Sequence, residues 1–221
     1  MQNIRIFFTK TGMAKYISHL DLMRCIMRAI KRANLPIWYT EGYNPHPFMT
    51  FALPLPLGTE SLCECVDIKL KEEIKSEDII KLMNDVLPVD IKVTKAAEPV
   101  LNPREIAFAD YKITFYTDNS KSLNEYLETI LNKDEILAEK KSKKGKNKIF
   151  KQINLKEQIK SFSVANEEKA VIINTVLNAG SSNNLNPTLL TDTLIKNFDK
   201  EIDCIDIVKL NIYTELMKEF E

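Results

Sequence analysis

The first hundred residues combine two hydrophobic patterns. Residues 4–8 are rich in β-branched and aromatic side chains, which predicts a strand. After Ser18, apolar residues recur at helical spacing, at Leu20, Met23, Met27 and Ile30, and we expect this stripe to face the core. The pattern predicts a helix with Ser18 as its N-cap and Asp21 three residues further on. The same reasoning predicts a strand at 37–40, a strand at 63–70, a helix at 76–87 capped by Ser76, and a strand at 89–97. This β-α-β-β-α-β order is that of a ferredoxin-like fold.

A similar order returns after a linker marked by Pro99 and Pro103. The predicted elements are a strand at 110–117, a helix at 120–132, strands at 135–141, 157–164 and 169–177, a helix at 187–198 and a strand at 204–214. We therefore expect an α+β protein of two ferredoxin-like (βαββαβ) lobes, at 1–98 and 104–221, each an antiparallel sheet with its helices packed on one face. Only the order of elements repeats between the halves, not the sequence itself.

Composition fits a folded protein of the cytoplasm. The chain has 221 residues, of which 44% are hydrophobic and 28% charged, which is ordinary globular usage. No apolar run approaches the roughly 20 residues that span a bilayer, and the first residues lack the pattern of a signal peptide. Four cysteines are too few for the disulfide framework of a small secreted domain, so we expect free thiols and no membrane association.

Charge is balanced overall but unevenly distributed. Seven lysines and no acidic residue lie between positions 140 and 151, which leaves 24 basic against 31 acidic residues in the remainder. Gly145 lies near the centre of this segment and favours a hairpin tip. The candidate RNA-binding residues here are Lys141, Lys143, Lys144 and Lys146. The alternative is that these lysines protect an exposed strand from pairing with other chains.

Four segments carry a resemblance to a known family. They are 16–24 (YISHLDLMR), 28–36 (RAIKRANLP), 41–47 (EGYNPHP) and 51–61 (FALPLPLGTES). Together they resemble the signature of the radical-SAM-linked family, a domain of unknown function. The resemblance implies a bacterial protein found beside, or fused to, a radical SAM protein that often carries a cobalamin-binding-like domain, frequently near genes for ribosome components or a ribonuclease.

The cysteines indicate which protein, this chain or the radical SAM protein beside it, would hold the cluster. Radical SAM enzymes hold a [4Fe–4S] cluster through three closely spaced cysteines. The four cysteines here do not form such a trio; they are Cys25, Cys63, Cys65 and Cys204. We therefore expect no cofactor in this chain, and a partner that carries the [4Fe–4S] cluster and S-adenosylmethionine.

Three arginines of the first predicted helix form a candidate phosphate-binding ridge. Arg24, Arg28 and Arg32 follow one another at spacings of four, so they lie on one face of the helix. The planar guanidinium fork matches the geometry of phosphate oxygens. The alternative is an ordinary solvated face of a surface helix.

Two further groups of residues are candidates for chemistry or binding. His19 and Asp21, at the start of the same helix, could act as acid or base in RNA cleavage, although a structural histidine is commoner. Tyr43, Asn44 and His46 lie in a loop with one glycine and two prolines, and aromatic and amide groups suit an unpaired base or an organic ligand. His19 and His46 have no clear third ligand, so no metal site is predicted.

Three functions remain open from the sequence. The leading hypothesis is an accessory RNA-binding or substrate-presenting protein that works with a radical SAM partner, in modification of tRNA or rRNA. The first alternative is a metal-independent endoribonuclease using His19, because two such lobes also resemble CRISPR repeat-processing endoribonucleases; the glycine-rich C-terminal loop of those enzymes is absent. The second alternative is a protein-interaction scaffold that docks through a sheet edge or the 54–56 segment.

Overall fold

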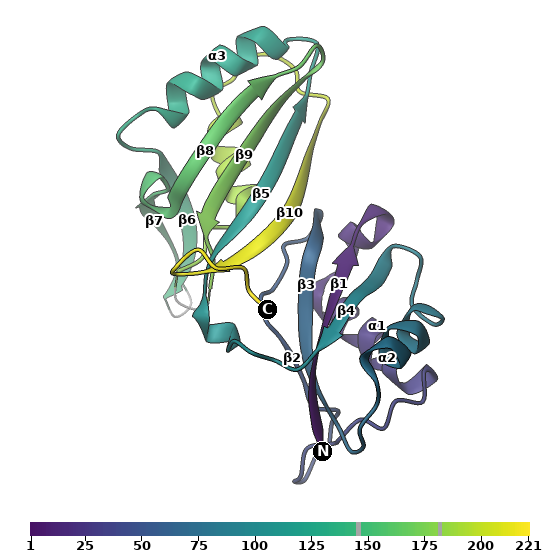
Figure 1. The fold of residues 1–221 in the computed structure, drawn as a ribbon. Coiled ribbons are helices and arrows are strands. Elements are labelled where there is room, and N and C mark those ends of the chain that lie inside the picture. The colour runs from purple at the N-terminus through teal and green to yellow at the C-terminus, as the bar shows by residue number, and fades with distance from the viewer. Residues whose placement is uncertain (145–146, 181–182) are drawn as a thin grey trace. The chain divides into compact units, whose positions relative to one another are not determined.

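The chain has a mixed α/β fold built on a mostly antiparallel sheet. The computed structural model describes the backbone of residues 1–144, 147–180 and 183–221, and within these ranges the side chains outside 140–151 (Figure 1). The described residues form four α-helices and two compact units. Unit 1 comprises Met1–Ile106 and Val208–Glu221, and unit 2 comprises Ala107–Ile207.

Unit 1 is a sheet covered by two helices. Its elements are β1 (Gln2–Lys10), a short 3-10 helix η1 (Gly12–Tyr16), α1 (His19–Arg32), β2 (Met49–Phe51), β3 (Thr59–Leu70), α2 (Ser76–Asn84), β4 (Ile91–Ala97) and η2 (Pro103–Glu105). The strand order is β4-β1-β3, with β2 also paired to β3, and β1 and β2 both run antiparallel to β3, as β4 does to β1. The strand β10 (Cys204–Thr214) neighbours β3, and its residues 208–214 belong to this unit.

Alternation along the strands creates the core of unit 1. Ile4, Ile6 and Phe8 point to one face of β1, as period-two geometry requires. Apolar residues of β3 and β4 share this cluster with those of α1 and α2, so both helices pack on the same face. The buried residues of α1 are Leu22, Ile26, Ala29 and Ile30. Their three- and four-residue spacing leaves the opposite face of α1 to solvent.

The N-cap predicted for α1 is confirmed, but its predicted apolar stripe is only partly right, because Ile30 is buried whereas Leu20 is 53% exposed. The prediction for α2 is also partly wrong. The Ser18 hydroxyl accepts a hydrogen bond from the backbone N–H of Asp21 at 3.2 Å, as an N-cap should. Helix α2, in contrast, begins at Ser76 itself, its cap position is Lys75, and no side chain caps it. It ends at Asn84, whose side-chain amide bonds both the N–H and the C=O of Val93.

The second strand lies further along the chain than predicted. Residues 37–40 form only isolated bridges, which pair Ile37 with Leu70 and Tyr39 with Pro47. The strand that pairs with β3 is β2, at Met49–Phe51. Prolines lack a backbone N–H, so Pro36 before the segment and Pro47 opposite it interrupt any regular ladder.

Unit 2 contains the remaining elements. They are β5 (Ile106–Tyr116, its first residue in unit 1), α3 (Ser120–Leu131), β6 (Leu137–Lys144), β7 (Asn147–Asn154), η3 (Lys156–Gln158), β8 (Ile159–Asn166), β9 (Ala170–Asn178) and α4 (Pro187–Ile195). The order is β5-β9-β8, with β10 as the other neighbour of β5, while β6 and β7 form a separate two-stranded sheet. The predicted strand at 135–141 therefore forms a separate hairpin instead of joining the main sheet.

The start of α4 agrees with the sequence prediction. Pro187 occupies the first turn of α4, as predicted, and the Asn186 side chain caps the helix by accepting from the N–H of Thr188. Among the described residues, the structure contains no helix with both the length and the apolar character that a bilayer crossing requires.

Candidate functional site

The solvent face of α1 carries a groove lined largely by arginines. The groove has a volume of about 390 Å³, and its lining residues are Asp21, Arg24, Cys25, Arg28 and Arg32. The i, i+4 spacing of α1 places these side chains along one face, opposite the buried stripe. We call this feature the arginine groove. It brings together four of the five site residues that the sequence indicated on this helix, all except His19, and it adds Cys25, which the sequence analysis did not indicate as a site residue.

One end of the arginine groove is held by local contacts. The Ser18 hydroxyl donates to Asp21 Oδ2 at 2.7 Å, and Arg24 Nη1 donates to Asp21 Oδ1 at 3.1 Å. These two interactions, the Ser18 hydrogen bond foremost, hold the pKa of Asp21 below its usual range. Asp21 is therefore ionised at neutral pH, where it orients Arg24.

The rest of the arginine groove is less occupied by protein contacts. Arg32 Nη2 donates to the backbone carbonyl of Val86 at 2.8 Å. Arg28, between the other two arginines, makes no hydrogen bond or ion pair with any residue of the described ranges. Three guanidinium groups face a single carboxylate, so the groove is positively charged. Burial raises the pKa of the Cys25 thiol, which is therefore neutral at physiological pH.

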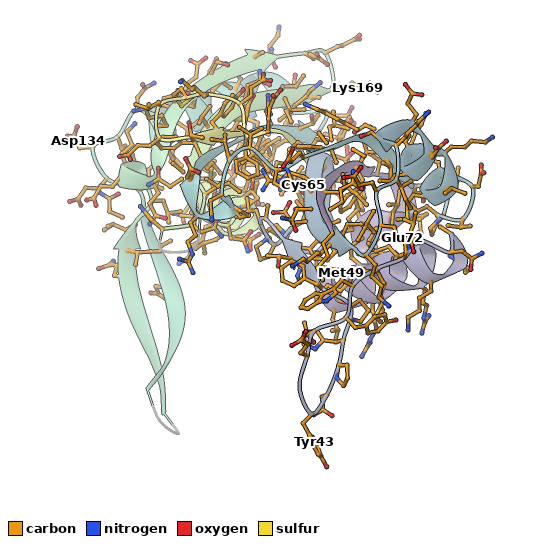
Figure 2. All side chains as sticks on the ribbon, turned by 60° about the horizontal axis from the view of Figure 1, so that its bottom comes forward. Tyr43, Met49, Cys65, Glu72, Asp134 and Lys169 are labelled. Atoms are coloured by element: carbon orange, nitrogen blue, oxygen red, sulfur yellow. The ribbon has the colours of Figure 1, made fainter. Side chains whose placement is uncertain are left out.

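A second exposed feature is the loop at 38–48, between α1 and β2. Phe48 N–H donates to Trp38 C=O at 3.0 Å, and Thr40 N–H donates to His46 C=O at 2.9 Å. The His46 ring is fixed inside the loop, because its Nδ1 lies 3.1 Å from Thr40 Oγ1 and 3.2 Å from the Asn44 carbonyl oxygen. Figure 2 shows the ring of Tyr43 projecting from the tip of this loop.

The two histidines lie in different settings. The His19 ring packs edge-on against Phe51, with ring centroids 5.2 Å apart at 80°. It does not line the arginine groove, and the structure does not group it with Asp21, which bonds Ser18 and Arg24 instead. Within the described ranges there is no group of three or more histidine, cysteine or acidic side chains able to hold a metal ion.

The lysine-rich segment can be placed only in part. Lys141, Lys143 and Lys144 belong to β6, which pairs with β7 as the predicted hairpin requires. Their side chains, Lys146 and the predicted tip at Gly145 lie outside the described residues.

A buried charged cluster was missed by the sequence analysis. Lys10, Glu64 and Lys209 are 1%, 2% and 0% exposed, and Lys209 Nζ lies 2.6 Å from Glu64 Oε1. Lys10 Nζ lies 3.4 Å from the backbone oxygens of Lys15 and Ile17, and burial lowers its pKa. We call this set the buried lysine cluster. The sequence does carry one signal for this cluster, because Lys10 continues the alternation of inward-pointing residues along β1.

The contacts of the buried lysine cluster place it inside unit 1, under the turn that leads to α1. Because two lysines share one glutamate in a region closed to solvent, Glu64 is their principal compensation.

Comparison with known proteins supports a family assignment. No curated protein matches the chain. A family model described as an uncharacterized protein conserved in bacteria, DUF2344, matches residues 3–187, which is most of the chain and includes α1 and the loop at 38–48. The chain therefore belongs to the DUF2344 family.

Proposed function

We propose that the chain is an accessory protein that binds the phosphate backbone of RNA and presents that RNA to a partner enzyme. The arginine groove carries this proposal. It offers guanidinium donors on one rigid helix, with Asp21 orienting Arg24, while Arg28 forms no hydrogen bond or ion pair within the described part of the chain. Guanidinium groups bind phosphate oxygens through two parallel hydrogen bonds, and phosphate contacts supply most of the affinity of a protein for nucleic acid.

The strand orders favour the ferredoxin-like interpretation of both units. In chain order, the strands of unit 1 are arranged as fourth-first-third-second, with β4 at one side and β2 at the other. If the β6–β7 hairpin is treated as an insertion, the order β10-β5-β9-β8 follows the same rule. Sheets of this kind with exposed helices serve many unrelated functions, so the fold permits RNA binding without requiring it.

The proposed partner is a radical SAM protein, possessing its own [4Fe–4S] cluster and S-adenosylmethionine. This part rests on the resemblance of the sequence signature. It agrees with the distribution of thiols, because Cys25 lies on α1, Cys63 and Cys65 on β3, and Cys204 on β10. In this proposal, this chain contacts the RNA, and the partner carries out the chemical modification of tRNA or rRNA.

The experiment is a comparison of two charge reversals. Fluorescence anisotropy with labelled tRNA and rRNA fragments at low salt would compare the wild type, Arg24→Glu/Arg28→Glu, and a control, Lys81→Glu/Lys92→Glu. The control changes the net charge equally at two exposed sites of unit 1, on α2 and β4. We expect the arginine variant to lose about tenfold or more in affinity and the control to lose little.

The same experiment addresses the alternatives. Equal affinity of the two variants would contradict the proposal. RNA cut by the wild type but not by His19→Ala would favour the endoribonuclease, and absence of RNA binding by the wild type would favour the protein-interaction scaffold.

A further inference from the structure

The loop at 38–48 is rigid at its base. Trp38 N–H donates to the backbone oxygen of Lys69 on β3 at 2.7 Å, and the rings of Trp38 and Phe48 lie 6.0 Å apart at 60°. Lys69 Nζ lies over the Trp38 ring, 4.8 Å from its centroid. Backbone pairing, ring packing and a cation–π contact therefore anchor both ends of the loop to the sheet.

The upper part of the loop is also fixed by internal contacts. Thr40 bonds His46 twice, through its N–H to the carbonyl and through its hydroxyl to the His46 N–H at 3.1 Å. Pro45 and Pro47 restrict the path further, because a proline ring fixes φ. Gly42 has φ +126°, a backbone conformation that residues with a side chain rarely adopt. This glycine lies directly before Tyr43, at the tip of the loop.

This scaffold presents one aromatic ring to solvent. Tyr43 is 99% exposed, so both faces of its ring are accessible, and the figure shows it pointing away from unit 1 (Figure 2). A rigid loop loses little conformational entropy when its exposed aromatic ring binds a ligand, because the loop backbone is already ordered. Such a ring can stack on a flat ligand without rearrangement of the protein.

We propose that Tyr43 stacks on an unpaired base, so that the ligand class is RNA with single-stranded or looped-out nucleotides and not a continuous duplex. This inference rests on the proposed RNA-binding function, and it names the RNA that the chain selects. Bases inside a duplex hide their faces by stacking on each other, whereas unpaired bases expose them to aromatic side chains. The arginine groove contacts phosphates, which single and double strands share, so selection between the two falls to the loop.

The test uses two RNAs of equal length, about 12 nucleotides, one an oligouridylate, whose bases are unpaired and stack weakly, and the other part of a blunt duplex. We expect the wild type to prefer the single strand. Tyr43→Ala should weaken single-strand binding about 5- to 150-fold and duplex binding little. Tyr43→Phe keeps the ring and should retain the preference. Tyr16→Ala, which removes another exposed aromatic ring of unit 1, is the matched control and should bind both RNAs as the wild type does.

The outcomes separate this inference from the proposed function. If Tyr43→Ala binds both RNAs as the wild type does while Arg24→Glu/Arg28→Glu binds neither, the base-stacking role is wrong and the RNA-binding function stands. If the wild type binds no RNA, both are wrong. If Tyr43→Ala abolishes capture of a protein partner and leaves RNA affinity unchanged, the loop is a protein-docking element and the inference is overturned.

Discussion

Replacing Glu64 with Gln tests the buried lysine cluster directly. The substitution keeps the shape of the side chain but removes its charge, which leaves Lys10 and Lys209 in a region closed to solvent without their carboxylate. Removing one partner of a buried ion pair typically costs about 3–5 kcal/mol, because the remaining charge is neither solvated nor paired. That is a large part of the roughly 5–15 kcal/mol that stabilises an ordinary domain.

Urea unfolding followed by tryptophan fluorescence measures this loss of stability in unit 1, where the cluster lies. Trp38 is the single tryptophan of the sequence and lies in unit 1, as the cluster does. With a urea dependence of about 2 kcal/mol per molar, the expected loss lowers the unfolding midpoint by roughly 1.5–2.5 M. Combining Glu64→Gln with Lys209→Met removes one of the two buried ammonium groups that lie near Glu64, so the double variant should be more stable than Glu64→Gln alone.

A matched substitution controls for the loss of any carboxylate. Glu60 pairs with Lys15 at 3.5 Å near the surface of the same unit, so Glu60→Gln should cost less than about 1 kcal/mol. Midpoints of Glu64→Gln and Glu60→Gln that agree within error would refute the electrostatic account of the cluster.

Two further predictions concern the same end of unit 1. The pKa of Lys10 is lowered from 10.5 by burial, so the folded state binds fewer protons there than the unfolded state, and this group makes stability rise as pH increases through its folded pKa toward 10.5. Lys10→Met should therefore flatten that alkaline rise and stabilise the protein at neutral pH, as measured by thermal unfolding across pH 7–10; an unchanged slope would contradict the assignment. Gly12→Ala should destabilise unit 1 by about 1–2 kcal/mol, because Gly12 has φ +53° and an added Cβ would lie 2.9 Å from Asp90 Oδ1. Urea unfolding would show this loss, and Gly58→Ala separates the two causes, since φ is also positive there (+81°) but nothing lies within 4 Å of the added Cβ.

Elements governed by local signals could be predicted from the sequence. The N-cap at Ser18 and the helix that follows it are encoded within a few residues, although the sequence placed the exposed Leu20 in the buried stripe. The bounds of β10 at Cys204–Thr214 match the predicted strand. The arginine groove follows from the same local rule, because i, i+4 spacing on one helix is independent of the rest of the chain. The sequence could therefore predict that Asp21 and the three arginines lie together on one face of α1.

Features that depend on distant residues could not be predicted in this way. Glu64 meets Lys209, a partner 145 positions away, and only the sheet brings them together. Arg5 is a similar case, since it is buried and bonds Asp67, the Leu101 carbonyl and the Glu221 carbonyl. These contacts hold the C-terminal segment in unit 1, and no local pattern indicates them.

The most direct test of the account is the salt dependence of RNA binding by the wild type and by a variant with Arg24, Arg28 and Arg32 all changed to Ala. Each phosphate neutralised on a single strand contributes about −0.7 to the slope of log Kobs against log salt, so three arginine contacts contribute about −2. We predict that the triple variant binds more weakly and that its slope is shallower by about 2. A variant with the affinity and slope of the wild type would show that the arginine groove does not bind RNA phosphates.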